Sequence, residues 1–225
     1  MAFDSNWEQR YAENTHLSVW PWSDLVSLVH RHCKPLIAAK AGRVLELGCG
    51  AGANIPLFLA LGMDYYAIEG SPTIVAQLHQ RYSNLVENIR IGDFTVDQPL
   101  GVFFDVVIDR ASLTHNNTSS IKNALKISFS IIKPGGLFIG TDWFSNKHTD
   151  FSSGEMAGDY YTHNNFNNGQ FVGVGNVHFS DETHLRDLFS KFEILYMEEK
   201  VVRRYEPNDN HQFASWNIVA KRPIE

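Results

Sequence analysis

The sequence predicts an α/β fold with a mainly parallel sheet. Short β-type runs alternate with stretches of helical periodicity from residue 43 to residue 143, a pattern typical of parallel strands joined by helices. A glycine-rich turn, GCGAG, connects the first of these runs to the next helical stretch. The last two β-type runs are separated by the polar turn EPNDN, so we expect them to pair antiparallel.

The elements follow one another in a regular order. Strands are expected at residues 43–47, 65–69, 89–93, 103–110, 137–143, 192–202 and 215–222. Helices are expected at residues 22–39, 53–62, 71–82, 119–133 and 180–189, with Ser23, Ser71 and Ser180 as N-caps of the first, third and fifth. Residues 144–178 show no clear periodicity, and a loop of that length in a compact domain is usually functional or disordered.

Composition and charge narrow the class of protein. The chain carries 19 basic and 25 acidic residues, for a net charge of −6, and no dense basic patch, which disfavours a nucleic-acid substrate. Two cysteines are too few for a disulfide framework and favour a reducing compartment. We find neither a signal peptide nor an apolar run long enough to cross a bilayer. A cytoplasmic monomer or homodimer with no membrane partner is expected.

The glycine turn predicts a nucleotide-like ligand. Gly48, Gly50 and Gly52 leave backbone N–H groups open to a ligand at the start of a helix. Glu69 ends the second predicted strand, where a carboxylate can accept hydrogen bonds from both ribose hydroxyls. Asp93 follows the third strand and could accept from an adenine amine, with Phe94 against the ring. In a parallel sheet these strand ends open on one edge.

These residues carry a family resemblance. The stretch VLELGCGAG resembles the first motif of class I S-adenosylmethionine (SAM)-dependent methyltransferases. YYAIEGSP, IRIGDF, FFDVVIDRASLTH and KPGGLFIGTD resemble the later motifs in the same order and spacing, over about residues 43–142. The resemblance implies a Rossmann-like, doubly wound, mainly parallel seven-stranded sheet with an antiparallel C-terminal strand. It also implies SAM as cofactor and methyl transfer as the reaction.

The resemblance assigns roles to particular residues. The cofactor would be bound by residues of the glycine turn, of the next two strand ends, of the fourth strand end and of the N-terminal segment: Tyr11, Glu46, Gly48, Cys49, Gly50, Gly52, Glu69, Gly70, Ser71, Asp93, Phe94, Asp109 and Arg110. Glu46 would brace the loop. Many relatives carry Asp-x-Ser after the second strand, whereas this chain has Glu69, Gly70 and Ser71; a Glu still reaches the diol.

The acceptor side is less defined. His115 and Asp109 are the candidate catalytic residues, and a histidine in such a site can act as a general base or merely position the substrate. Trp20, His115, Trp143, Tyr160 and Tyr161 are the candidate substrate-binding residues, and aromatic rings among amides suit a sugar or another polar metabolite. An N-terminal cap formed by Trp7, Tyr11, His16 and Trp20 competes with simple packing.

The resemblance also divides the chain. We expect a single domain over residues 1–225, with N-terminal cap helices at 1–40 and a SAM-binding core at 41–142. A substrate lid would occupy residues 143–179, and a C-terminal helix and strand pair residues 180–225.

Two other functions fit parts of the pattern. A SAM-binding protein without catalysis would carry the same glycine turn. An NAD-dependent short-chain dehydrogenase would explain Tyr196 and Lys200, but these lie in a β-type run, and Ala53 replaces the last glycine of the dinucleotide fingerprint. The run HRHC, residues 30–33, does not place its side chains on one helix face, so no metal site is expected.

Overall fold

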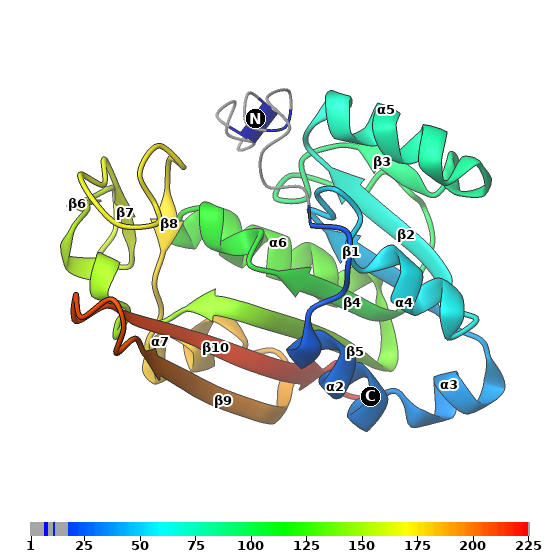
Figure 1. Ribbon diagram of the computed structural model, residues 1–225. Helices are drawn as coiled ribbons and strands as arrows, with labels where there is room; N and C mark the ends of the chain where they lie inside the picture. The colour runs from blue at the N-terminus through cyan, green and yellow to red at the C-terminus, as the bar shows by residue number, and fades with distance from the viewer. Residues whose placement is uncertain (1–6, 9–10, 12–17, 225) are drawn as a thin grey trace.

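A seven-stranded sheet runs through the molecule in the order β3-β2-β1-β4-β5-β10-β9 (Figure 1). The computed structural model describes residues 7–8, 11 and 18–224. The strands are β1 (Arg43–Leu47), β2 (Asp64–Glu69), β3 (Ile89–Ile91), β4 (Phe104–Arg110), β5 (Ile132–Phe144), β9 (Glu193–Arg203) and β10 (Gln212–Lys221). The first five pair in parallel, and β10 pairs antiparallel with both β5 and β9. This confirms the predicted fold class.

Alternation along the strands divides the core into two layers. On β4, Val106 and Ile108 face one side of the sheet while Val107 faces the other. The first layer is covered by α2 (Ser23–His32), α4 (Ile55–Ala60) and α5 (Pro72–Arg81). The second layer is covered by α6 (Thr118–Ile131) and α7 (Glu182–Leu188). The strands are apolar on both faces because helices cover both.

The N-terminal helical stretch differs from the prediction. The expected helix over residues 22–39 is two helices, α2 and α3 (Lys34–Ala39), which meet at Cys33. Pro35 lacks the N–H that would donate to the carbonyl of Arg31, so α2 ends before it, and Pro35 lies in the first turn of α3, where no such donor is needed. Ser23 lies inside α2 and Trp22 is its N-cap, without a side-chain hydrogen bond.

Of the other two predicted N-caps, Ser71 is confirmed and Ser180 is wrong. Ser71 caps α5, where its Oγ accepts from the N–H of Ile74 at 3.1 Å. Ser180 does not cap α7; Asp181 does, and its carboxylate accepts from the N–H of His184 at 2.8 Å. Both residues suit an N-cap chemically, so the sequence alone did not distinguish them.

Residues 144–178 are ordered rather than irregular. They contain the 3₁₀ turn η3 (Thr149–Ser152) and a small sheet of β6 (Glu155–Met156), β7 (Thr162–Asn164) and β8 (Val177–His178). Their apolar side chains form a third cluster with the end of β5, made by Ala111, Phe144, Phe166, Phe171, Val174, Val177 and Phe179. Strands of two or three residues are too short for periodicity to reveal.

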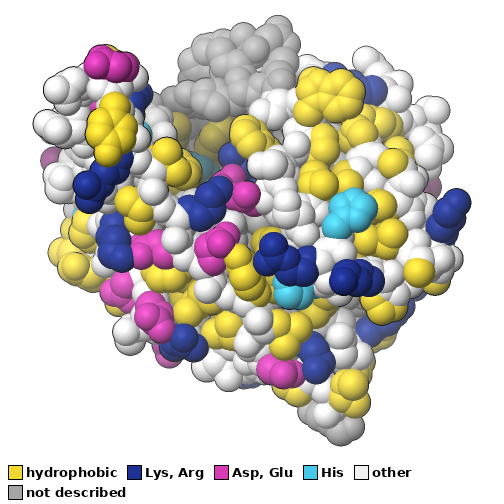
Figure 2. Space-filling view, turned by 60° about the horizontal axis from the view of Figure 1, so that its bottom comes forward, with side chains coloured by type: hydrophobic (Ala, Val, Ile, Leu, Met, Phe, Trp, Pro, Cys, Tyr) yellow, Lys and Arg dark blue, Asp and Glu magenta, His cyan; other side chains and the backbone are white. Residues whose placement is uncertain are grey.

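Charged side chains are interspersed on the surface. On the face shown in Figure 2, basic and acidic groups lie beside one another rather than in blocks of one sign. The outer strands illustrate this, with Lys221 paired to Glu193 at 2.9 Å and Lys200 paired to Asp24. In the described part of the chain, no helix is both long and apolar enough to span a membrane.

Candidate active site

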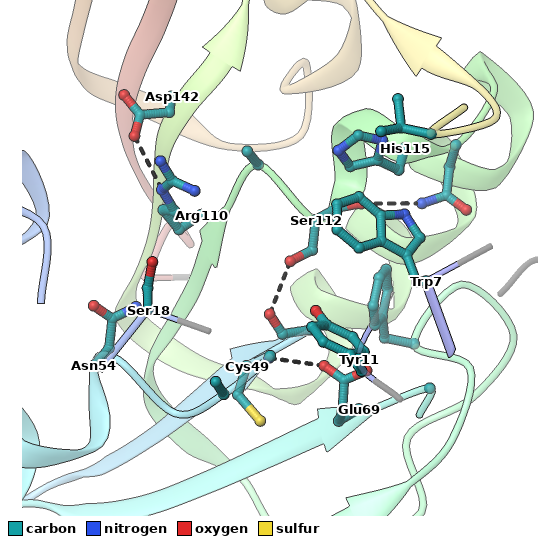
Figure 3. A pocket seen from close by; sticks show the side chains of 18 of the residues that line it. Trp7, Tyr11, Ser18, Cys49, Asn54, Glu69, Arg110, Ser112, His115 and Asp142 are labelled. Atoms are coloured by element: carbon teal, nitrogen blue, oxygen red, sulfur yellow. Dashed lines mark hydrogen bonds and ion pairs between the residues drawn. The ribbon is translucent and has the colours of Figure 1, made fainter. Parts of the chain in front are cut away.

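A cavity of about 470 Å³ opens at the carboxyl ends of β1 to β4. Strand order reverses between β1 and β4, and open α/β sheets bind their ligands at such a switch point. Ten of the predicted site residues line the cavity: Tyr11, Gly48, Cys49, Gly50, Glu69, Gly70, Asp93, Phe94, Arg110 and His115. In Figure 3, Arg110 lies on one side of the pocket and His115 on the other.

The glycine turn is shaped by its contacts. Gly48 has a φ of +67°, and a Cβ there would lie 2.4 Å from Ser112 Oγ. Gly50 has a φ of +49°, and a Cβ there would lie 3.1 Å from the Tyr11 hydroxyl oxygen. Gly52 does not line the cavity, because its missing side chain makes room for Leu78 and Ile55 instead. Gly48 and Gly50 therefore border the cavity, whereas the absence of a side chain at Gly52 lets Leu78 of α5 pack against the turn.

Glu69 fastens the turn to the end of β2. Its two carboxylate oxygens accept from the N–H of Gly50 at 2.8 Å and from the N–H of Ser71 at 2.9 Å. Burial raises the pKa of this carboxyl, while the backbone hydrogen bonds of Ser71 and Gly50 oppose that rise. Each oxygen has a second lone pair, so the group retains acceptors for ligand hydroxyls.

Glu46 lies behind the turn and not in the cavity. It accepts from Asn54 Nδ2 at 2.7 Å and from the Tyr65 hydroxyl at 2.5 Å, which is the bracing that the sequence predicted. Burial raises the pKa of Glu46 to about 7. Asn54 lines the cavity, and its buried Oδ1 has no hydrogen-bond partner in the described structure. Buried polar atoms normally have a hydrogen-bond partner, so this oxygen is an exception at the cavity wall.

Asp93 and Phe94 form the next wall, after β3. Asp93 Oδ1 accepts from the backbone N–H and the hydroxyl of Thr95, at 3.0 and 2.6 Å. The Phe94 ring packs against the glycine turn, since a Cβ on Gly48 would lie 3.3 Å from it. The structure thus places an anchored carboxylate and an aromatic side chain together on this wall, where the sequence predicts the adenine pocket.

His115 is held in one tautomer on the opposite wall. It ends the 3₁₀ turn η2 (Leu113–His115), and its Nδ1 lies 3.1 Å from the carbonyl oxygen of Asn176. A carbonyl oxygen only accepts, so Nδ1 carries the proton and Nε2 bears the lone pair. The ring packs edge-on against Trp7, with centroids 4.8 Å apart. The imidazole is thus oriented with a basic nitrogen.

Asp109 and Trp143 do not reach the cavity. Both are fully buried, and Trp143 Nε1 donates to Asp109 Oδ2 at 2.7 Å. The other oxygen of Asp109 accepts from the N–H of Leu113 at 3.0 Å, which fixes the start of η2. Burial raises the pKa of Asp109 to about 7. The pair supports the loop that carries His115; neither residue can touch a bound molecule.

Four further predicted residues lie away from the cavity. Trp20 is 75% exposed outside it, and Tyr160 is 58% exposed on the lid. Tyr161 stacks on His184 with ring centroids 3.6 Å apart. Ser71 is buried, and its hydroxyl donates to Glu8. The three aromatic residues were predicted to bind the substrate, and Ser71 the cofactor. The directions of the Tyr161 and Ser71 side chains are set by packing partners distant in sequence, His184 and Glu8.

Several lining residues were missed by sequence reasoning. Trp7, which was considered only as part of a cap, lines the cavity with Tyr11, while His16 lies outside the described residues. The remaining lining residues come from the N-terminal segment, the strand ends and the lid: Ser18, Trp22, Ala51, Asn54, Gly92, Ala111, Ser112, Asn116, Asp142, Phe144, Gln170, Phe171, Val174 and Phe213. Asp142 carried a signal, because it is a carboxylate near the end of the fifth strand, as Glu69 is at the end of the second. The lid residues carried none.

One cluster has metal-ligand chemistry but the wrong tautomer. His148, Asp150 and His211 bring ligand atoms within 4.8 Å of one another. His148 Nδ1 accepts from the N–H of Asp150 at 3.0 Å, so its proton lies on Nε2. A ligating histidine instead donates its second nitrogen's proton to a neighbour. His148 instead serves as the N-cap of η3.

The Tyr196–Lys200 pair is also accounted for. Both residues lie on β9 outside the cavity, where Lys200 pairs with Asp24 and the Tyr196 hydroxyl donates to Glu198 at 2.6 Å. They are surface contacts of an edge strand rather than a dehydrogenase dyad.

The fold and the site together define the class I SAM-dependent methyltransferases: a parallel sheet with an antiparallel C-terminal strand, a glycine turn after β1, and carboxylates after β2 and β3. A family model described as a methyltransferase domain matches residues 22–193. The chain belongs to this family and is a SAM-dependent methyltransferase.

Solved structures share the fold at low sequence identity. A SAM-dependent methyltransferase from Methanosarcina mazei has a TM-score of 0.64 at 18% identity, covering 85% of this chain and 98% of that one. An amino pentose methyltransferase from Micromonospora echinaspora has a TM-score of 0.59 at 17% identity, with 98% of both chains covered. A 1,6-didemethyltoxoflavin-N1-methyltransferase from Burkholderia thailandensis has a TM-score of 0.54 at 19% identity, covering 89% and 86%. No curated protein matches the sequence.

Proposed function

We propose that the chain transfers the methyl group of SAM to a ring-bearing small molecule, such as a sugar or another polar metabolite. The observation that carries the proposal is the convergence of the Gly48–Gly50 turn, Glu69 and Asp93 on one cavity. The residues fit the cofactor, because the cavity offers a ribose acceptor, an anchored carboxylate beside a ring, and the unpartnered oxygen of Asn54.

The bound sulfonium supplies an electrophilic methyl group. The protein's part is to hold it and the acceptor in line and to keep water out, which provides much of the rate of such a transfer. Glu69 would hold the ribose, Asp93 and Phe94 the adenine, and Asn54 Oδ1 the ammonium of the methionine part. Trp7 and Tyr11 cover the turn, and Glu8 ties their segment to α5 by accepting from Ser71 and Thr73.

His115 would remove the proton from a hydroxyl or ammonium acceptor. Its Nε2 is the basic nitrogen, and Asn176 holds the ring in place through Nδ1. Asp109, which the sequence suggested as catalytic, would act only by fixing the turn that carries His115.

The lid side of the cavity supports a ring-bearing acceptor. Phe144, Phe171 and Phe213 present aromatic faces there, and Gln170 offers an amide among them. The amino pentose and toxoflavin enzymes of similar fold are named for acceptors with heteroatom-bearing rings. The net charge of −6 and the two buried free cysteines are in keeping with a cytoplasmic enzyme of small molecules.

Titration calorimetry with S-adenosylhomocysteine (SAH), SAM and NAD tests the cofactor. We expect both sulfur nucleosides to bind and NAD not to; binding of NAD alone would overturn the proposal. Labelled SAM with a panel of amino sugars and hydroxylated heterocycles tests the transfer. Tight SAM binding with no label transferred to any member would instead favour the non-catalytic SAM-binding protein.

The Glu69→Gln variant tests the ribose contact. Loss of hydrogen bonds to a charged group costs about 1–3 kcal/mol, so SAH should bind roughly 5- to 150-fold more weakly. Because Glu69 also fastens the turn, the same titration is repeated with an SAH analogue lacking the ribose 2′-hydroxyl. The wild type should discriminate between the two ligands and the variant should not. Glu87→Gln, on the surface, is the control.

A further inference from the structure

Arg110 is the cationic side chain of the cavity. Among the described lining residues it is the single lysine or arginine, facing the carboxylates of Glu69, Asp93 and Asp142. It is the last residue of β4, and its side chain is 31% exposed. A charged group placed in a ligand cavity needs a reason, because a surface position would solvate it at no cost.

The guanidinium is fixed in orientation by two contacts. Its Nε donates to Asp142 Oδ2 at 3.0 Å, and its plane lies over the Trp22 ring with Cζ 3.8 Å from the ring centroid. In the described structure neither Nη atom has a hydrogen-bond partner. An arginine held at Nε and at one face presents its two Nη groups as a preset fork, the geometry that binds a carboxylate through two hydrogen bonds.

The backbone on both sides of this fork is strained. Ala111 follows Arg110 with a φ of +58°, and Asp142 has a φ of +56°, and neither is a glycine. Such conformations cost energy for residues with a Cβ and concentrate at functional sites. Here they turn β4 and β5 so that Arg110 and its partner both border the cavity (Figure 3).

We propose that Arg110 binds a carboxylate in the active site through its Nη fork. The inference rests on the proposed function and deepens it, because two molecules in that site could supply the group: the methionine part of the cofactor or an acidic acceptor. Asp142 does not compete for the fork, since it takes the Nε–H alone. Its role is to position the guanidinium.

Calorimetry on the full chain separates the two sources. The first pair of probes is SAH and the SAH analogue without the carboxylate. If Arg110 binds the cofactor, Arg110→Met should weaken SAH about 10- to 100-fold and leave the analogue unchanged. The second pair is benzoate and benzamide, titrated into SAH-saturated protein. If Arg110 binds the acceptor, benzoate should bind better than benzamide, and the variant should lose that preference.

Two further variants keep the test interpretable. Arg110→Lys keeps the charge but not the fork, and it should lose most of the same affinity, about 3- to 10-fold at least. Arg90→Met is the matched control, because Arg90 forms a surface ion pair with Glu87 away from the cavity. Equal affinities of wild type and Arg110→Met for all four probes would overturn the inference. Failure of the wild type to bind SAH would instead overturn the proposed function.

Discussion

Three buried carboxylates at neighbouring strand ends do different work, and their hydrogen bonds separate them. Glu69 accepts backbone N–H groups at the cavity, Glu46 braces the turn from behind, and Asp109 holds η2 from within the core. All three are carboxylates at the last or next-to-last position of a strand. Only the identity of the donors, which come from elsewhere in the chain, decides which carboxylate reaches a ligand.

Asp109→Asn should destabilise the protein without removing the site. An asparagine places its NH₂ against Leu113 N–H or Trp143 Nε1–H, both of which only donate, so one buried hydrogen bond is lost. Urea unfolding at pH 7.5 should show a loss of about 1–3 kcal/mol. Asp64→Asn, at the exposed start of β2, is the control. Unchanged stability with abolished SAH binding would mean that Asp109 contacts the ligand after all.

His115→Gln should change the pH dependence of methyl transfer and not cofactor binding. A general base contributes about 10²- to 10⁴-fold to the rate of a reaction. With a methyl acceptor in hand, kcat/KM of the variant should therefore be lower than that of the wild type by this factor. The acidic limb of the wild-type profile should disappear in the variant. SAH affinity within about twofold of wild type is required. A variant that keeps the acidic limb would assign the proton transfer to another group.

At the scale of elements, the small sheet of β6, β7 and β8 is joined to α7 by two neutral histidines. His178 on β8 lies 3.0 Å from His184 on α7, Nε2 to Nε2, and its Nδ1 lies 3.1 Å from Thr162 Oγ1 on β7. A single proton between the two Nε2 atoms forms the hydrogen bond. If both Nε2 atoms carried a proton, the two N–H groups would point at one another. Burial lowers the pKa of His178 to about 3, and it lowers the pKa of His184 as well.

This contact predicts that the attachment of the β6–β8 sheet to α7 weakens in acid. A histidine whose folded pKa lies below its unfolded value of 6.5 binds more protons when detached, so attachment is strongest above pH 6.5 and weakens as pH falls toward 3. Hydrogen-exchange protection of the β7 and β8 amides, corrected for intrinsic rates, should fall about 10-fold between pH 7.5 and 5. His184→Gln should flatten this dependence, whereas His30→Gln, on the surface, should not. Equal pH dependence in all three proteins would contradict the role of the pair.

For the whole molecule, Glu46 should make stability fall with rising pH. Its folded pKa of about 7 lies above the reference value of 4.5. Between these values the folded protein holds a proton that the unfolded chain has lost, so the free energy of unfolding decreases as pH rises from about 4.5 to 7 and is level above.

The Glu46→Gln variant isolates this contribution. Gln keeps an acceptor for Asn54 and can donate to the Tyr65 oxygen, so the local geometry is retained. Relative to the variant, the wild type should lose about 1–2 kcal/mol of unfolding free energy between pH 5 and 7, measured in urea. Glu155→Gln, on the exposed β6, provides the control. Parallel pH curves for wild type and Glu46→Gln would show that Glu46 titrates normally.

The sequence by itself determined the fold class, a mainly parallel seven-stranded sheet with an antiparallel C-terminal strand, and by resemblance it indicated SAM as the cofactor. These depend on local features: alternating apolar residues, glycines at positive φ, and carboxylates at successive strand ends, which any parallel sheet brings to one edge. Gly48, Gly50, Glu69, Asp93 and Phe94 were found for that reason.

The rest of the cavity wall was decided by tertiary structure alone. Asp109 and Trp143 satisfy one another in the core, while Trp22 and Asp142 position Arg110 at the cavity. The two residues of each contact are 32 or more positions apart in the sequence. No local sequence pattern predicts a contact over that separation. A buried polar side chain points toward the group that can form a hydrogen bond with it. Which group lies within reach is known only from the folded structure.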